Sequence, residues 1–145
     1  MWGRGRDPAV EAAWSGFLRF ARTLEEGSRA LLATVPSARR PGAPLQASVA
    51  GFLAAVESAR AELPAWALPG LADAQAASAA ALDAAERRAR ELPAAAEGLA
   101  FEHRNERVAE VLDELAPIQA AEQALRALRR RGYPATGGRQ RRHGR

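Results

Sequence analysis

Cysteine is absent from this 145-residue sequence, so disulfide bonds and thiolate metal sites are excluded. Histidine occurs only twice, which argues against zinc catalysis and against a histidine-activated nucleophile. No glycine-rich phosphate loop follows a strand-like segment, and no pair of carboxylates stands out as a general acid and a general base. We therefore expect a protein that is not an enzyme and that binds no metal or cofactor.

Long apolar runs are missing as well. No stretch approaches the roughly 18 consecutive apolar residues that a transmembrane helix needs. The first residues also lack the apolar region of a signal peptide. The sequence therefore predicts a soluble, cytoplasmic protein without a transmembrane segment.

Lysine is also absent, and all 21 basic residues other than the histidines are arginine. A GC-rich genome produces this bias through codon usage, so the number of arginines says little about nucleic-acid binding. Their distribution says more. Residues 7–128 hold 12 Arg against all 17 acidic residues, a balance of −5, whereas the two flanks hold 9 Arg and no acidic residue. This segregation indicates an anionic partner at the ends of the chain.

Proline divides the central part of the chain into blocks in which apolar residues recur every three or four positions, as in amphipathic helices. A domain of this length buries roughly 68–70% of the surface of its unfolded chain, which is enough for a core. The first block begins with Asp7 as N-cap and Pro8 in the first turn. Its spacing averages roughly 3.5 residues, which predicts a coiled-coil-like seam. The seam residues are Val10, Trp14, Phe17, Ala21, Leu24, Ser28, Leu31 and Val35.

Two further blocks follow a loop over residues 36–44 that contains Arg39 and Arg40. The second block stops before Pro64, because proline cannot continue the helix. The third block, 71–91, is rich in alanine, and a connector containing Trp66 precedes it. The predicted inward residues are Leu45, Val49, Phe52, Val56, Ala59 and Leu63 in the second block, and Leu71, Gln75, Ser78, Leu82, Ala85, Ala89 and Leu92 in the third.

We predict that the fourth block begins at Pro93. Pro117 lies inside it and should either kink the helix or split it in two. Three arginines at 129–131 and Gly132 indicate where the helix ends, and Pro134 prevents it from resuming. The predicted inward residues are Phe101, Val108, Val111, Leu112, Leu115, Ile118, Leu125 and Leu128.

These four blocks predict an all-α fold, an up-and-down antiparallel four-helix bundle. The chain then has three parts: a basic arm at 1–6, the helical domain at 7–131, and a disordered Arg/Gly-rich tail at 132–145. With an even number of helices, both termini leave from the same end of the bundle. Arg39 and Arg40 would lie at the opposite end.

The arginine-rich C-terminal region is the first candidate site, because guanidinium groups bind phosphate in a bidentate manner. The competing explanation is that the arginines only complement a helix C-terminus and keep the tail soluble. Tyr133 is the only aromatic residue there, so a base-stacking platform is missing. The candidate anion or nucleic-acid contacts are Arg129, Arg130, Arg131, Arg139, Arg141, Arg142 and Arg145.

A second candidate is a ridge of like charge in the fourth block. Its members recur every four residues and are Glu102, Glu106, Glu110 and Glu114. We expect this ridge to face water, where it either is only solvated or contacts a partner, including the arginines of a second copy. His103 and Glu106 are three residues apart and so lie on one face of the helix. A carboxylate-bridged metal site needs a glutamate–histidine pair from each of two helices.

Three further residues have two possible roles each. Arg104 and Asn105 flank the apolar face and should be partly buried, so they either pair within the bundle or line a polar ligand pocket. Trp66 either closes one end of the bundle or is an exposed contact for a partner.

The sequence therefore predicts a non-enzymatic bundle that works by binding another protein or a second copy of itself, as a scaffold, adaptor or regulatory subunit. The alternative is a nucleic-acid-associated protein that holds phosphates through its arginine-rich termini. A membrane surface is a weaker third partner, because no block combines a basic face with exposed aromatic residues.

Overall fold

The computed structural model describes residues 7–36 and 42–132, and within these ranges it contains helices and turns but no strand. The prediction of an all-α fold is therefore confirmed. The basic arm, most of the first loop and the C-terminal tail after Gly132 lie outside the described residues, so the predictions made for them stay predictions.

The first helix, α1, spans Pro8–Leu32 and begins as its sequence predicts. The side chain of Asp7 accepts a hydrogen bond from the backbone N–H of Ala9 at 2.9 Å, and Pro8 occupies the first turn, where its missing N–H costs nothing. Beyond the other end of α1, the hydroxyl of Thr34 donates to the backbone carbonyl of Leu31 at 2.8 Å, and both residues are buried.

The second helix, α2, spans Leu45–Glu62 and stops before Pro64, as predicted. Two short 3-10 helices follow, η2 at Leu63–Trp66 and η3 at Pro69–Leu71. They lead the chain into α3, which spans Ala72–Ala96.

The prediction that Pro93 begins the fourth helix is wrong, because Pro93 lies inside the last turns of α3. A proline removes one N–H donor and crowds the preceding turn, and because α3 ends at Ala96, little helix remains beyond the distortion. The chain turns instead at Gly98, whose φ of 74° is a conformation that glycine adopts readily. The fourth helix then begins at Phe101.

Of the two outcomes expected at Pro117, a kink or a break, the structure has the break. The helix α4 spans Phe101–Asp113, and α5 spans Pro117–Gly132 with the proline at its first position. Tight turns bridge the break, and the N–H groups of Leu115 and Ala116 donate to carbonyls three residues earlier, at 3.0 and 3.1 Å.

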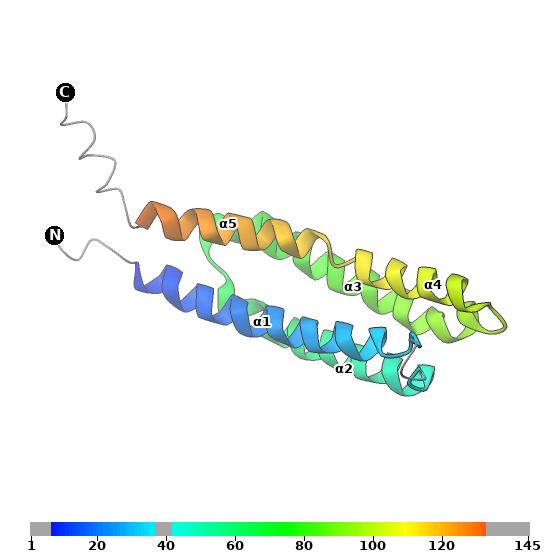
Figure 1. Cartoon of the computed structure of the whole chain (residues 1–145). Helices are drawn as coiled ribbons and strands as arrows, with labels where there is room; N and C mark the ends of the chain where they lie inside the picture. Colours follow the sequence, from blue (N-terminus) through cyan, green and yellow to red (C-terminus); the bar gives the residue numbers. More distant parts are fainter. Residues whose placement is uncertain (1–6, 37–41, 133–145) are drawn as a thin grey trace, which may run out of the picture.

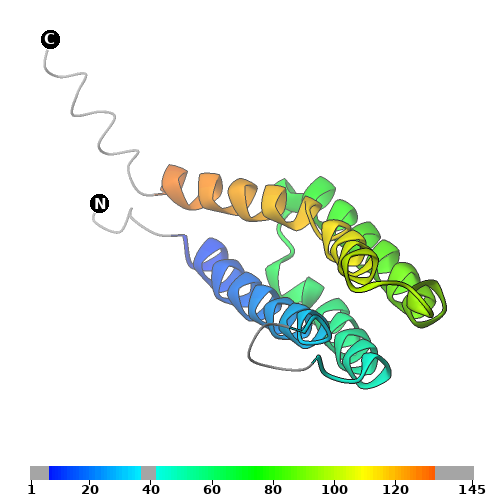
Figure 2. The same cartoon turned by 45° about the vertical axis from the view of Figure 1, so that its right-hand side comes forward.

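The helices α1 and α3 run in one direction, and α2 and the successive helices α4 and α5 run in the opposite one (Figure 1). One hairpin consists of α1 and α2, and the second consists of α3 with α4 and α5. Contacts of α2 with α3 and of α1 with α5 join the two hairpins. The start of α1 and the end of α5 lie at the same end of the molecule, which we call the terminal pole, as a second view also shows (Figure 2). The opposite end is the loop pole.

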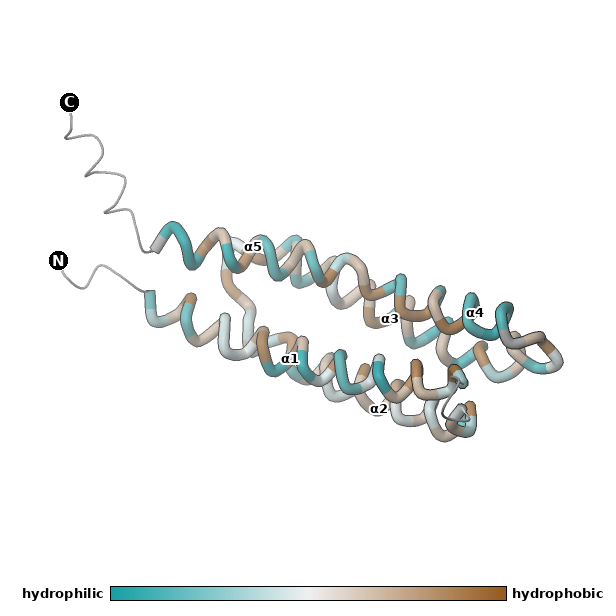
Figure 3. Tube along the Cα trace, viewed as in Figure 1, coloured by the Kyte–Doolittle hydropathy of each residue, from teal (hydrophilic) through white to brown (hydrophobic). Residues whose placement is uncertain are grey.

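Hydrophobic and hydrophilic residues are mixed along α1 and α5, as in amphipathic helices, whereas α2 is paler and less polar (Figure 3). Trp66 is the largest side chain that is completely buried in the described part of the core. Its ring lies 5.1 Å from that of Phe17 in an edge-to-face arrangement and 5.2 Å from that of Phe20. Such aromatic pairs each add about 0.5–1.5 kcal/mol beyond the burial of their area.

The predicted seam of α1 is partly wrong. Trp14 is only half-buried, whereas Ala13, Gly16, Phe20 and Gly27 are buried although the seam omits them. The four buried residues outside the seam form a second stripe beside it on α1, because η2 and α2 cover that side of the helix. The core of α1 is therefore wider than the stripe that a heptad pattern predicts.

Two glycines let the backbone of α1 approach its neighbours closely. A Cβ atom at Gly16 would lie 2.6 Å from the backbone oxygen of Ala65, and one at Gly27 would lie 2.4 Å from the Cβ of Ala55. Neither neighbouring atom belongs to a flexible side chain that can move aside. Close packing of α1 against α2 and η2 thus depends on the missing side chains.

We predict that Gly27→Ala destabilises the protein by about 1–3 kcal/mol, because the new methyl group overpacks the contact with Ala55. Helix propensity alone would predict that Gly27→Ala stabilises the protein, because alanine favours a helix more than glycine does. Gly51→Ala is the matched control, since its Cβ would lie 3.6 Å from the nearest atom and should stabilise α2 by up to about 1 kcal/mol. Denaturant unfolding measures both changes, and a stabilising Gly27→Ala would refute the close packing.

Candidate interaction surfaces

An open apolar groove lies where α1 faces the break between α4 and α5, with a volume of about 140 Å³. Its apolar walls are Phe17, Ala21, Leu24, Leu115 and Ile118, and its polar edges are Glu25, Ser28, Gln119 and Glu122. We call it the α1–α5 groove. It exists because α1 packs extensively on α2 but touches α4 and α5 at few points.

Two exposed leucines extend this apolar surface along α1. Leu18 is 43% exposed and Leu32 is 49% exposed, and they are the exposed large hydrophobic residues of the described ranges. Both are seven residues away from Glu25, which lines the groove. Since residues seven apart lie on the same side of a helix, the two leucines flank the groove on α1.

At the terminal pole, α5 is joined to α1 through Arg129. Its guanidinium group donates to both carboxylate oxygens of Glu11, at 3.0 and 3.2 Å, and lies 4.6 Å from the ring centroid of Trp14. The guanidinium of Arg126 also lies over this ring, at 5.2 Å. Trp14 is therefore half-buried beneath cations, at a distance typical of cation–π contacts.

These contacts change the expectation for the predicted anion site. Arg129 already binds an internal carboxylate, whereas Arg130 and Arg131 are exposed in the last turn of α5. The remaining predicted anion contacts, Arg139, Arg141, Arg142 and Arg145, lie outside the described residues.

The predicted ridge of four glutamates does not face water along its whole length. Glu110 and Glu114 are partly buried, and both pair with Arg88 of α3, the former at 3.6 Å. Glu102 and Glu106 are exposed. The prediction of a solvent-facing ridge was wrong for Glu110 and Glu114, because α3 covers that side of α4 and its Arg88 pairs with them.

His103 is exposed, and its Nδ1 lies 3.3 Å from a carboxylate oxygen of Glu106. In residues 7–36 and 42–132, no group of three or more potential metal ligands comes together.

Trp66 is not an exposed partner contact, and that prediction is wrong, because its side chain is completely buried against Phe17 and Phe20. The alternative prediction, that Trp66 packs inside the bundle, agrees with its burial. Its indole N–H has no hydrogen-bond partner among the described residues.

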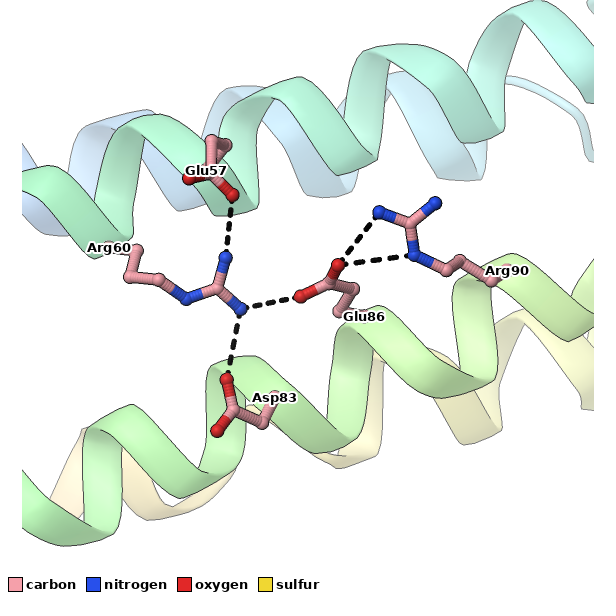
Figure 4. Close-up of polar contacts among 5 residues, drawn as sticks. All are labelled: Glu57, Arg60, Asp83, Glu86 and Arg90. Carbon is pink, nitrogen blue, oxygen red and sulfur yellow. Dashed lines mark hydrogen bonds and ion pairs between the residues drawn. The ribbon is translucent and has the colours of Figure 1, made fainter.

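Sequence patterns did not predict the largest ionic cluster, which joins α2 to α3 (Figure 4). Arg60 binds Glu57 at 2.6 Å, Asp83 at 3.0 Å and Glu86 at 2.6 Å. Glu86 also accepts two hydrogen bonds from Arg90, at 2.8 and 3.1 Å. The spacing within each helix is visible in the sequence, but the pairing between helices depends on how they pack.

The cluster shifts the ionisation of its members. Hydrogen bonds from Arg90 and Arg60 lower the pKa of the Glu86 carboxyl below its ordinary value. The hydrogen bond to Glu86 in turn raises the pKa of Arg60. Because the folded protein favours ionised Glu86, its stabilising effect is present above the ordinary pKa of glutamate and is lost as the pH falls through the lowered value.

The chain matches no protein-family model, and comparisons with curated proteins and with solved structures likewise found no match. Among the helices of the described ranges, none is both long and apolar enough to cross a lipid bilayer.

We predict that Glu86→Gln lowers the free energy of unfolding at pH 7, and that this difference shrinks as the pH falls below about 4.3, the ordinary pKa of glutamate. Protonation of Glu86 in the unsubstituted protein removes the same charge. Urea unfolding at several pH values measures the trend. Glu26→Gln is the control, since Glu26 is exposed and outside the cluster. A difference that stays constant with pH would contradict an ionised Glu86 in the cluster.

Proposed function

We propose that this protein acts by binding another protein, and that the α1–α5 groove takes the apolar face of a helix from that partner. The observation that carries this proposal is the open apolar groove between two hairpins, together with the exposed Leu18 and Leu32 on its edge. Helices that lay an apolar face into such a groove are a recurrent mode of protein recognition.

The size of the groove supports a single anchoring side chain. A cavity of roughly 150 Å³ in another protein holds benzene, so a volume of about 140 Å³ suits one leucine or one aromatic ring of the partner. The flanking leucines would contact the neighbouring turns of the same helix. A central apolar anchor with weaker contacts around it is the usual distribution of energy in an interface.

Charge at the edges of the groove favours a basic partner. Glu25 and Glu122 line it, and residues 7–128 carry a net −5. Both glutamates pair with an arginine one turn along the helix, at 2.9 and 2.8 Å. Exposed pairs of this kind contribute little, so lysine or arginine from a partner can join them. We therefore expect a helix with an apolar face and basic flanks.

The test uses a designed amphipathic peptide with a leucine seam and lysine flanks, and the same peptide with glutamate flanks. We expect the lysine peptide to bind more tightly, and its affinity to fall as salt is added. Ser28→Trp fills the groove and should weaken binding by at least about tenfold, which corresponds to about 1.4 kcal/mol. Isothermal titration calorimetry measures each affinity.

Ser15→Trp is the matched control, because it introduces the same side chain at an exposed position of α1 outside the groove. The proposal fails if both tryptophan variants bind the peptide as well as the unsubstituted protein does. It also fails if light scattering shows a dimer that Ser28→Trp dissociates, since a second copy then occupies the groove.

A second function, the binding of nucleic-acid phosphates, has support from the terminal pole. The start of α1 and the end of α5 lie together there and are joined by Arg129 and Glu11, and Arg130 and Arg131 are exposed. In the sequence, the two arginine-rich flanks are joined to these two helix ends. This function does not need the α1–α5 groove.

If the protein binds nucleic-acid phosphates, its affinity for random duplex DNA falls as salt is added. The logarithm of the binding constant then falls against the logarithm of the salt concentration with a slope of about −0.9 per phosphate neutralised. Removal of residues 132–145 should abolish binding at low salt, whereas Ser28→Trp should leave it unchanged. Equal binding by the full-length and shortened chains would exclude the tail as the contact.

A further inference from the structure

One arginine of the described helices is partly buried without a counter-ion. Arg60, Arg104 and Arg129 are the arginines there that are partly buried rather than exposed. Arg60 and Arg129 each bind a carboxylate at 3.0 Å or less. Arg104 forms no ion pair or side-chain hydrogen bond within residues 7–36 and 42–132, and its Nε atom is buried without a partner. A buried guanidinium nitrogen without an acceptor leaves a hydrogen bond that an anion can supply.

Arg104 lies on the wall of a cavity of about 370 Å³ at the loop pole. The first turn of α2 contributes Leu45 and Gln46, and the last turns of α3 contribute Pro93, Ala94 and Ala96. The cavity opens to solvent, and its volume lies in the range of small-molecule sites. We call it the loop-pole cavity. Its walls are mostly apolar, and Arg104 is the cation among the residues that line it.

We propose that the loop-pole cavity binds a small monocarboxylate with an apolar body, with Arg104 as the group that binds the carboxylate. A guanidinium group offers two parallel N–H donors that match the two oxygens of a carboxylate. The hydrocarbon part of the ligand would lie against the side chains of Leu45 and Pro93. This site is separate from the α1–α5 groove, and neither proposal depends on the other.

The charges around the cavity favour a singly charged ligand over a phosphate. Glu97 also lines the cavity, and the C-terminal end of α3 carries the negative end of the helix dipole. Both repel a dianion more strongly than a monoanion. On the opposite wall, α2 begins without a side-chain cap and without an acidic residue in its first turn, so this wall adds no negative charge.

Glu97 is the competing partner for Arg104, because it lines the same cavity. Glu97 is exposed and follows the last turn of α3. It forms no ion pair with Arg104 within 4.0 Å. If the ligand carboxylate occupies the site, Glu97→Gln should strengthen its binding, because a like charge is removed. If Glu97 itself neutralises Arg104 in solution, the unsubstituted protein will not bind the ligand.

The experiment titrates the full chain with hexanoate, with hexanol as the uncharged analogue and with inorganic phosphate. We expect saturable binding of hexanoate, and no saturable binding of hexanol or of inorganic phosphate. Arg104→Leu should weaken it at least tenfold, and Arg104→Lys should have an intermediate effect, since lysine keeps the charge but not the planar fork. Arg87→Leu is the control, because Arg87 is exposed and does not line the cavity, and it should bind as the unsubstituted protein does.

A circular dichroism melt of each variant separates lost binding from lost folding. The intermediate affinity of Arg104→Lys provides a second test if Arg104→Leu does not fold. The proposal is overturned if hexanoate does not bind the unsubstituted protein, if phosphate binds as tightly as hexanoate, or if folded Arg104→Leu and Arg104→Lys both bind it with unchanged affinity.

Discussion

The structure depends first on the close packing of α1 against α2 and η2. Gly27 brings α1 close to α2, and Gly16 lets the backbone at Ala65 approach, so that the ring of Trp66 packs against Phe17 and Phe20. A large aromatic side chain that is fully buried contributes more apolar area than any aliphatic residue of an alanine-rich core can. The hairpin of α1 and α2, together with η2, is thus held by dense packing, and the ion pair between Arg129 and Glu11 joins α5 to it.

The packing of α4 against the first hairpin is sparser, and both proposed sites follow from this difference. The helix α4 packs mainly on α3 and touches α1 at few points. Its inward positions include Arg104 and Asn105, whose Nε and Oδ1 atoms are buried without partners among the described residues. The break at Pro117 leaves the α1–α5 groove, and the extension of α3 through Pro93 forms one wall of the loop-pole cavity. Incomplete packing between the hairpins therefore produces both surfaces.

Local signals in the sequence predicted the local structure well. The cap at Asp7, the stop before Pro64 and the inward stripe of α2 need only neighbouring residues. Pro93 misled the prediction because the penalty for a proline depends on how much helix remains beyond it. The burial of Phe20 and the pairing of Arg60 with Glu86 depend on which helix lies alongside, and periodicity within one helix does not contain that information. The groove and the cavity were missed for the same reason, although Arg104 itself was recognised as a partly buried charge.

Hydrogen–deuterium exchange of the backbone amides, resolved by helix, tests the central claim that packing is dense between α1 and α2 and incomplete between α4 and this hairpin. We expect the amides of α1, α2 and α5 to exchange slowly and those of α4 to exchange much earlier, because α4 opens without disturbing the Trp66 cluster. Equal protection of α4 and α5 would contradict this claim, as would early exchange in the part of α1 around Phe17 and Phe20.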